Sequence, residues 1–332
     1  MNNKLVLLVA GILLLSLCSA FAGNSGKIGT AGAPELLIPV GARGTSLGGA
    51  VVADPRGVEA MYWNPAGLAT LEGTEMGFSY QPYIADIKVN WGGIATSIEG
   101  FGTLGASAKV ISIGDIEQTT EDHPEGTGSV FNPTLAVIGV TYARTLTANV
   151  AVGATAMLID ESIFQVKATG MAFDFGVIYD PRWRGLKFGM AIKNYGPNMR
   201  FDGAGFDLNA EVLGTRNVRS QAASFELPSH IDLGATYNFF NRDKHSITAD
   251  GVFRSNNFQD DMYQGGLEYS YNERYFLRGG YNYSNQADYI FGASFGGGLN
   301  LMIGGSKVSF EYTWTQTKVF TDNQYFTFKV AF

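Results

Sequence analysis

Residues 307–315 read KVSFEYTWT, and this stretch decides the fold class. Hydrophobic residues alternate with polar ones along it: Val308, Phe310, Tyr312 and Trp314 fall on one side, and Lys307, Ser309, Glu311, Thr313 and Thr315 on the other. Successive side chains of a β-strand point to opposite faces, so this alternation indicates a strand with one apolar and one polar face. The last eight residues, YFTFKVAF, repeat the pattern and end at Phe332.

The same alternation returns along most of the chain after residue 73. It predicts about fourteen strands, each near the length that a tilted strand needs to cross a bilayer. The expected spans are 74–84, 87–98, 102–113, 133–145, 148–163, 167–180, 185–194, 229–239, 244–256, 260–272, 274–285, 288–299, 306–316 and 322–332. Most connections are short polar turns, but those at 115–132 and 196–228 are long. An even strand count with short and long connections predicts an all-β, antiparallel outer-membrane β-barrel.

A soluble β-sandwich or propeller would also alternate, but two features favour the membrane barrel. Aromatic residues gather at strand ends, as in the girdles of membrane barrels. The polar faces also carry many charged residues. They are Glu75, Lys88, Lys109, Asp174, Lys187, Lys193, Asp232, Asp250, Arg254, Glu268, Arg274, Arg278, Lys307, Glu311 and Lys329. Such a lumen has mixed charge, which suits an interior of paired side chains or a plug better than a strongly selective ion pore.

Composition and the first residues indicate export to the bacterial outer membrane. The 332 residues have a net charge of −7, which disfavours nucleic-acid binding. Residues 1–22 predict a cleaved signal peptide, with Lys4, an apolar run over 5–17 and an Ala20-Phe21-Ala22 cleavage site. The apolar run is too short for a membrane anchor. A lipoprotein signal at Cys18 is disfavoured because Leu17 precedes it, and the mature chain then contains no cysteine.

Residues 23–73 lack the alternation and predict a hatch or plug inside the barrel, which would then occupy residues 74–332. Gly41, Gly44, Gly48 and Gly49 permit tight turns, whereas glycines in the strands are expected where the wall bends. No nucleotide site is expected, because no Gly-Lys-Ser/Thr follows these glycines. Asp54-Pro55 is expected to begin a turn or a short helix with Asp54 as its N-cap, and Asn64-Pro65 to end that helix.

Two stretches of this segment resemble a known family. Residues 37–50 read LIPVGARGTSLGGA and residues 63–68 read WNPAGL, and both resemble the N-terminus of the PorV/PorQ family. That family belongs to the FadL-like superfamily of 14-stranded outer-membrane barrels. The resemblance implies a hatch motif made of Gly41, Arg43, Gly44, Gly48, Gly49, Asn64, Pro65 and Ala66. It also implies that the terminal Phe332 is a signal for the outer-membrane assembly machinery.

The resemblance implies two alternative functions. A PorV-like protein is an accessory component of type IX protein secretion, with the translocon and exported proteins as partners besides outer-membrane lipid. Its binding surface is expected on the extracellular loops, such as 196–228 with Met199, Phe201, Phe206 and Leu208. A FadL-like protein instead takes up hydrophobic small molecules passively and should have an apolar ligand pocket at the hatch.

An enzyme is not expected, nor is a cofactor or a metal. The three histidines, His123, His230 and His245, lack the spacing of a metal site, and no cysteine pair exists. His123 lies in an acidic loop and the other two near strand ends. A lipase-like site at Ser229-His230 stays open as an alternative, because catalytic groups meet in space rather than in sequence.

Overall fold

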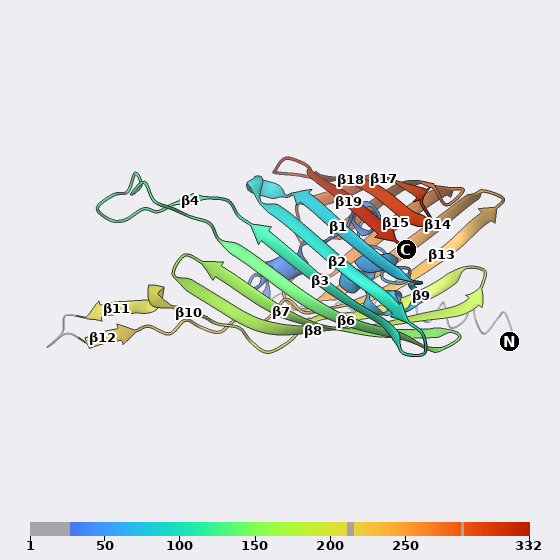
Figure 1. Cartoon of the computed structure of the whole chain (residues 1–332). Helices are drawn as coiled ribbons and strands as arrows, with labels where there is room; N and C mark the ends of the chain where they lie inside the picture. The colour runs from blue at the N-terminus through green and yellow to red at the C-terminus, as the bar shows by residue number, and fades with distance from the viewer. Residues whose placement is uncertain (1–26, 211–215, 287–288) are drawn as a thin grey trace.

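The computed structural model describes residues 27–210, 216–286 and 289–332; the predicted signal peptide lies outside them. Fourteen antiparallel strands of the described chain form one closed barrel (Figure 1). They are β1 (Thr74–Pro82), β2 (Lys88–Ile98), β3 (Gly102–Ser112), β6 (Thr134–Thr147), β7 (Val150–Ile163), β8 (Val166–Trp183), β9 (Leu186–Tyr195), β13 (His230–Arg242), β14 (His245–Asn256), β15 (Met262–Tyr271), β16 (Tyr275–Ser284), β17 (Phe291–Ile303), β18 (Ser306–Thr317) and β19 (Asn323–Ala331). The predicted fold class is therefore confirmed.

The barrel closes where the last strand pairs with the first. Met76 lies opposite Val330 and Tyr80 opposite Phe326, which brings β1 and β19 into register. β9 pairs with β8 on one side and, across the long connection over 196–228, with β13 on the other. Each strand thus has two partners, and no edge of the sheet is left open to lipid, as a membrane barrel requires.

The two ends of the barrel differ in the length of their connections. One end has turns of two or three residues, such as 148–149 and 304–305, and the other has the long loops. Because outer-membrane barrels place short turns in the periplasm, the looped end is the extracellular one. Its further elements are η5 (Ile84–Asp86), β4 (Ile116–Glu117), β5 (Val130–Phe131), β10 (Phe201–Gly203), η6 (Ala204–Phe206), β11 (Asp207–Ala210) and β12 (Arg216–Arg219). The β4–β5 and β11–β12 hairpins project from this end (Figure 1).

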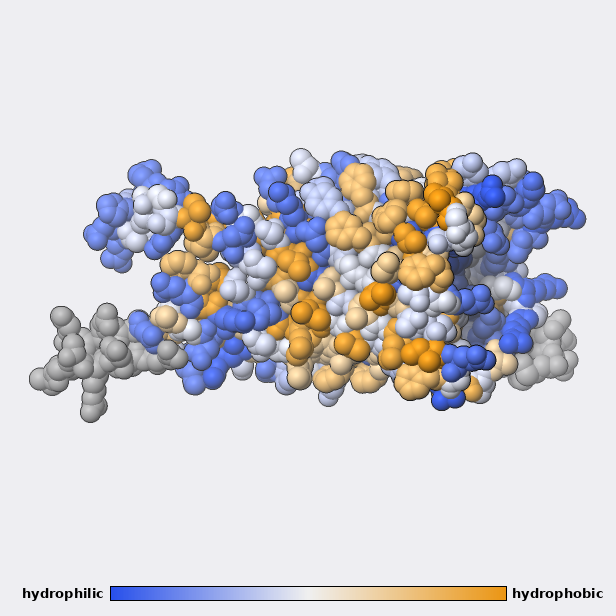
Figure 2. Space-filling model, viewed as in Figure 1, coloured by the Kyte–Doolittle hydropathy of each residue, from blue (hydrophilic) through white to orange (hydrophobic). Residues whose placement is uncertain are grey.

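The outer surface of the barrel carries an apolar band between polar ends (Figure 2). Val140 in β6, Leu267 in β15 and Phe310 in β18 contribute to it, with 58, 56 and 49% of their surface exposed. In a membrane, lipid tails cover such a band, so these apolar side chains contact lipid and not water. Among the described residues, no helix is long and apolar enough to span a bilayer.

One strand departs from the predicted division between lipid and lumen. In β2, the apolar residues Val89 and Trp91 face inward and are only 2 and 4% exposed, whereas Lys88 is exposed on the opposite face. The assignment of Lys88 to the lumen was therefore wrong. The physical reason is that this sector of the wall packs against apolar residues of the plug and not against charged ones.

The plug is a chain of short helical turns inside the barrel, drawn in blue in Figure 1. Its elements are η2 (Pro34–Leu37), α2 (Ala42–Ser46), η3 (Gly57–Glu59), α3 (Ala60–Trp63) and η4 (Pro65–Thr70). α3 ends before Asn64-Pro65, as the sequence indicates. Asp54, however, is not an N-cap: η3 begins at Gly57 after an Arg56 cap, because the Asp54 carboxylate binds cations instead.

The plug has an apolar face and a polar face. Val40, Val58, Met61 and Leu68 pack against Trp91 and its neighbours on β2 and β6. The opposite face carries charged side chains that meet the charged wall of β15, β18 and β19. The inner wall of the barrel therefore matches the plug, with an apolar side facing its apolar face and a charged side facing its charged face.

Placing a charge on the lipid-facing band should destabilise the barrel. Val140→Arg is expected to cost about 2–4 kcal/mol of unfolding free energy, because Val140 points outward near the middle of β6. Denaturant titration of the protein in lipid vesicles measures this cost, with Val140→Leu as the matched control. An equal stability of the two variants would contradict the lipid-facing assignment.

Candidate functional site

Arg43 of α2 is the centre of an ionic cluster that holds the plug to the wall. Its guanidinium, almost fully buried, contacts a Glu268 carboxylate oxygen at 3.2 Å through Nε and the Asp54 carboxylate at 3.3 Å through Nη2. Nη1 also donates to the Asp54 carbonyl at 2.8 Å. Arg56 joins the same two carboxylates, at 2.6 Å from Asp54 and 2.9 Å from Glu268. Plug residues and β15 thus share one set of charges.

The cluster continues around the wall. Arg278 of β16 contacts Glu268 at 2.7 Å and Glu311 of β18 at 3.4 Å. Lys329 of β19 lies 3.1 Å from Glu311 and 3.3 Å from Glu59 of the plug. Because these charges are buried, each needs an opposite partner, and the cluster supplies one to every member. The expectation of a lumen filled with paired charges is confirmed here.

Asp54 receives cations from both the plug and the wall. Besides Arg43 and Arg56, Lys187 of β9 binds it at 2.8 Å. Burial alone would raise the pKa of the Asp54 carboxyl, but Arg56, Arg43 and Lys187 outweigh it and hold that pKa well below its usual range. A carboxyl with a lowered pKa stabilises the fold above its ordinary pKa and loses this contribution as the pH falls below it.

The motif glycines allow close contacts around the same cluster. Gly41 has a φ of 79°, and a Cβ there would lie 2.3 Å from the Glu59 carboxyl carbon. Gly44 lies against the Trp63 indole, while Gly49 lies against the Gln264 side chain. Gly48 has a φ of 65° and lies against the backbone of Tyr281 in β16. Gly48 and Gly49 thus place the loop around α2 directly on the wall, whereas Gly41 and Gly44 allow close packing within the plug.

Asn64, Pro65 and Ala66 contact the opposite side of the barrel. The fully buried Asn64 side chain donates to the carbonyls of Val52 at 2.7 Å, Met190 of β9 at 3.3 Å and Val177 of β8 at 3.4 Å. Its Oδ1 accepts a hydrogen bond from the Ala66 backbone and so caps η4. The structure thus places the motif at two contacts with the wall, one ionic near Arg43 and one made of backbone hydrogen bonds at Asn64.

The wall contacts the plug largely through glycines of its strands, which therefore serve close packing and not only the bending expected from the sequence. A Cβ added at Gly153, Gly176 or Gly189 would lie within 2.4 Å of plug atoms, the nearest being Asn64 Oδ1 at 1.9 Å from Gly176. We call the set of lumen-facing wall glycines that contact the plug the glycine belt: Gly77, Gly93, Gly105, Gly153, Gly176, Gly189, Gly234, Gly266, Gly280 and Gly296. Glycine in a strand permits this close approach of another backbone. The clue in the sequence was that these glycines recur strand after strand.

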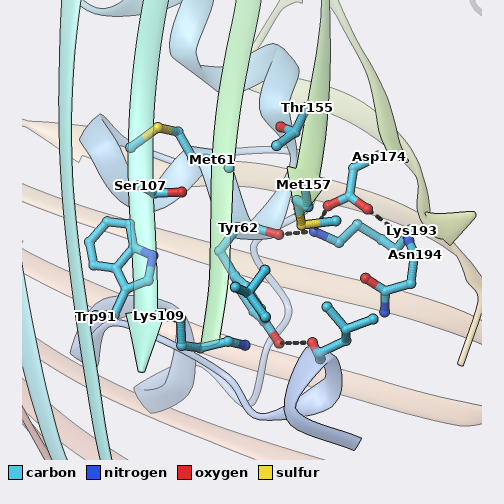
Figure 3. Close-up of a pocket in the computed structure, with 13 residues that line it drawn as sticks. Met61, Tyr62, Trp91, Ser107, Lys109, Thr155, Met157, Asp174, Lys193 and Asn194 are labelled. Carbon is cyan, nitrogen blue, oxygen red and sulfur yellow. Dashed lines mark hydrogen bonds and ion pairs between the residues drawn. The ribbon is translucent and has the colours of Figure 1, made fainter. Parts of the chain in front are cut away.

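A small cavity lies between the plug and strands β2, β3, β6, β7, β8 and β9 (Figure 3). The volume in which the centre of a water molecule fits is about 30 Å³, enough for about two waters. Lys193 lines it, binding Asp174 at 2.5 Å and donating to the Tyr62 carbonyl. Lys109 lies 4.8 Å from the centre of the Tyr62 ring. Apolar side chains such as Leu36, Met61 and Val137 line most of the cavity, which is too small for a hydrophobic ligand of ordinary size.

Part of the long loop over 196–228 forms a cap over the lumen. Met199 is 2% exposed and Leu227 3%, and both pack with Leu36 of the plug and Ile159 of β7. Met199 therefore does not lie on an exposed binding surface, because it fills the apolar mouth of the barrel. Phe201 and Phe206 are half-buried, and the Leu208 side chain lies outside the described residues.

The histidines and Phe332 lie apart from this site. His123 is exposed on the loop between β4 and β5, and His245 bonds the Tyr269 hydroxyl at 2.8 Å. His230 is buried, with Nε2 at 3.7 Å from Asp232, which Arg254 binds at 2.6 Å. Phe332 donates its backbone N–H to the Thr74 carbonyl and accepts from the Thr74 N–H, both at 2.9 Å, at the seam of the barrel.

Known proteins resemble the chain both in sequence and in fold. Residues 21–255 match the family model described as type IX secretion system protein PorV. No match was found among proteins with curated descriptions.

Similar solved structures are outer-membrane channels. The monoaromatic hydrocarbon channel CymD has 15% identity and a TM-score of 0.55, over 89% of this chain and 98% of that one. The Ralstonia pickettii toluene transporter TbuX has 16% identity and a TM-score of 0.54, over 88 and 98%. A Pseudomonas aeruginosa FadL homologue has 11% identity and a TM-score of 0.55, over 88 and 98%. At these identities the likeness shows a FadL-like fold alone.

A methyl group on the glycine belt should loosen the plug. Gly176→Ala places a Cβ on the Asn64 amide, so the bonds from Asn64 to Val52 and Met190 break, at a cost of about 1–3 kcal/mol. Hydrogen exchange over 60–70 should accelerate. Gly251→Ala in β14, where a Cβ would meet nothing within 4 Å, is the control and should leave exchange unchanged. Equal exchange in both variants would argue against the contact.

Neutralising Asp54 should destabilise the plug at neutral pH. Asp54→Asn leaves Arg43, Arg56 and Lys187 without their shared carboxylate, and breaking a buried pair costs about 3–5 kcal/mol. The difference from the native chain should begin to shrink as the pH falls toward 3, because below its ordinary pKa the native Asp54 progressively loses its contribution. Denaturant titrations at pH 7 and pH 3 measure this. Asp122→Asn on the exposed loop is the control, and a difference that stays constant with pH would refute the assignment.

Proposed function

Because the chain belongs to the PorV family of type IX secretion system proteins, we propose that it is an accessory component of type IX protein secretion that binds the translocon or its cargo at the outer membrane. The proposed role is one of binding, without a catalytic step. Its partners would be other proteins on the extracellular side and lipid around the barrel.

The single observation that carries this proposal is the way in which the lumen is filled. Arg43, Asp54 and Glu268 fasten the plug with buried ion pairs, and the glycine belt brings its backbone against the wall. A drug-sized ligand occupies a pocket of about 300–1,000 Å³, whereas the cavity beside Tyr62 has room for about two waters. A barrel sealed in this way fits a role through its outer surfaces better than a role through its lumen.

The extracellular loops supply a surface with the character of a protein-binding site. Beyond the membrane band, Val130 is 63% exposed and Ile116 41% exposed, on the two strands of the β4–β5 hairpin. Phe164, 51% exposed, lies 5.0 Å from the Phe131 ring. The connection over 113–133 adds five acidic residues and no lysine or arginine. Exposed apolar side chains with a charged rim are typical of protein interaction sites.

The alternative proposal is a channel for passive uptake of hydrophobic small molecules. The FadL-like fold favours it, as does the apolar cluster of Leu36, Ile159 and Met199 under the extracellular cap. Such a ligand would have to displace part of the plug, because the cavity is small in the structure.

Affinity purification from detergent-extracted outer membrane tests the proposal. The tagged native chain is expected to recover the large β-barrel translocon of the secretion system. The double variant Ile116→Ser/Val130→Ser should recover at least ten-fold less of it, because the apolar hairpin surface is lost. Val319→Ser, which changes a valine that is 74% exposed on another extracellular loop, is the matched control and should recover as much as the native chain.

Heat-modified migration on a gel verifies that each variant is a folded barrel. Recovery of a bound lipid or hydrocarbon with no translocon would overturn the proposal in favour of the channel. Equal recovery by all three chains would place the binding surface elsewhere and refute the role given to the hairpin.

A further inference from the structure

Two buried carboxyl groups meet where the outermost turn of the plug touches the wall. Glu35 of η2 is 0% exposed, and Glu161 of β7 is 3% exposed. Both oxygens of Glu35 and Oε2 of Glu161 have no hydrogen-bond donor among the described groups. The two carboxyls nevertheless lie within hydrogen-bonding reach of each other. If both were ionised, two acceptors would face each other with no proton between them.

The surroundings of the pair are mostly apolar. Ala33, Leu36, Val137, Ile159, Ala168, Ala172, Met199 and Leu227 form the cluster around η2. The nearest cation is Lys109 of β3, whose Nζ donates to the Ile38 carbonyl at 3.0 Å. The Tyr62 hydroxyl donates to the Leu36 carbonyl at 3.4 Å. At the mouth, Lys27 pairs with Glu226 at 3.1 Å, and both are partly exposed.

A divalent cation does not fit this place. Calcium takes six to eight oxygen ligands and magnesium six, but aliphatic side chains occupy the space around Glu35 and Glu161. Within the described ranges, no group of three or more acidic, histidine or cysteine residues is arranged to hold a metal ion. A single proton can relieve the repulsion between the two carboxylates. One carboxyl carries the proton and donates a hydrogen bond to the other, so that one negative charge remains near Lys109.

The charge balance of Glu35 agrees with this geometry. Burial raises the pKa of the Glu35 carboxyl, and the neighbouring Glu161 raises it further, to about 8 from an ordinary 4.5. This raised pKa favours the protonated form of Glu35 in the closed plug. The carboxyl would ionise if η2 moved out into water.

We propose that Glu35 and Glu161 form a proton-sharing latch that fastens the outermost turn of the plug to β7 and is released when the shared proton is lost. Leu36, next to Glu35, lines the cavity beside Tyr62 and packs under the cap residue Met199. Release of η2 would therefore loosen the cap and open the cavity toward the cell exterior. The latch makes access to the lumen dependent on pH.

Linkage fixes the expected pH profile. Opening releases one proton between the ordinary pKa of 4.5 and the raised value near 8, so the open fraction should rise about ten-fold per pH unit in that window. Above about pH 8 the rise should stop, because Glu35 is then ionised in both states. The latch contributes most stability at low pH and none above the window.

Cysteine accessibility in proteoliposomes measures the open fraction. Ala33→Cys places a thiol one residue before η2 at a site that is 1% exposed. Its rate of reaction with a membrane-impermeant maleimide is divided by that of Thr120→Cys on an exposed loop, which removes the pH dependence of the thiol itself. In the native background this ratio should rise steeply between pH 5 and 8. In the Glu35→Gln background the ratio should stay low at every pH, because glutamine can still donate a hydrogen bond to Glu161 and cannot ionise.

Glu161→Gln provides an independent check that does not depend on the folding of the first variant. It removes the second charge, so the plateau should move to lower pH. The proposal is overturned if the ratio in the native background does not change with pH, or if Glu35→Gln keeps the same slope. A closed state that chelator opens at pH 6 would assign the pair to a divalent cation and would equally refute the latch.

Discussion

The buried guanidinium of Arg43 is the constraint on which the rest of the structure depends. Withdrawing an arginine from water is costly unless carboxylates surround it. Asp54 lies eleven residues away in the plug, but Glu268 is 225 residues distant in sequence, on β15. The plug and the barrel can satisfy this one side chain only together. The other charges on this side of the lumen, among them Arg56 and Lys329, likewise need partners of opposite charge from both the plug and the wall.

The opposite side of the lumen follows a different rule. There Met61, Leu68 and Trp91 exclude water, and Asn64 bonds to backbone carbonyls of β8 and β9. The glycine belt allows the ionic contacts and the packing contacts to form together, because it lacks the side chains that would hold the plug away from the wall. A plug fixed by charges on one flank and by packing on the other has little freedom to rotate or slide. This rigidity fits a family whose role we place at the protein surface.

The strand pattern could be predicted because the lipid and the lumen impose opposite demands on neighbouring residues. Each of the fourteen expected spans corresponds to one strand, and boundaries mostly differ by a few residues. The rule failed at Lys88, where it assumed a polar lumen but the plug presents apolar side chains to β2. It failed at Asp54 for a related reason: a local capping preference lost to three cations, one of them on a distant strand. The partners of Arg43 and Asn64, and the meeting of Glu35 with Glu161, depend on which strands face which turn of the plug. Alternation along a single strand carries no such information.

The path of the plug has a consequence for how the molecule is made. Lys27 lies at the extracellular mouth beside Glu226 and Phe258, whereas Thr74 begins β1 at the periplasmic end beside Phe332. The chain between them therefore runs through the whole length of a closed ring. β1 follows the plug directly, and β19 is the last of the fourteen barrel strands in chain order. The pairing of these two strands therefore closes the barrel. Joining these two strands around a segment already laid against the inner wall avoids threading it afterwards through a finished cylinder, so closure and filling become a single event.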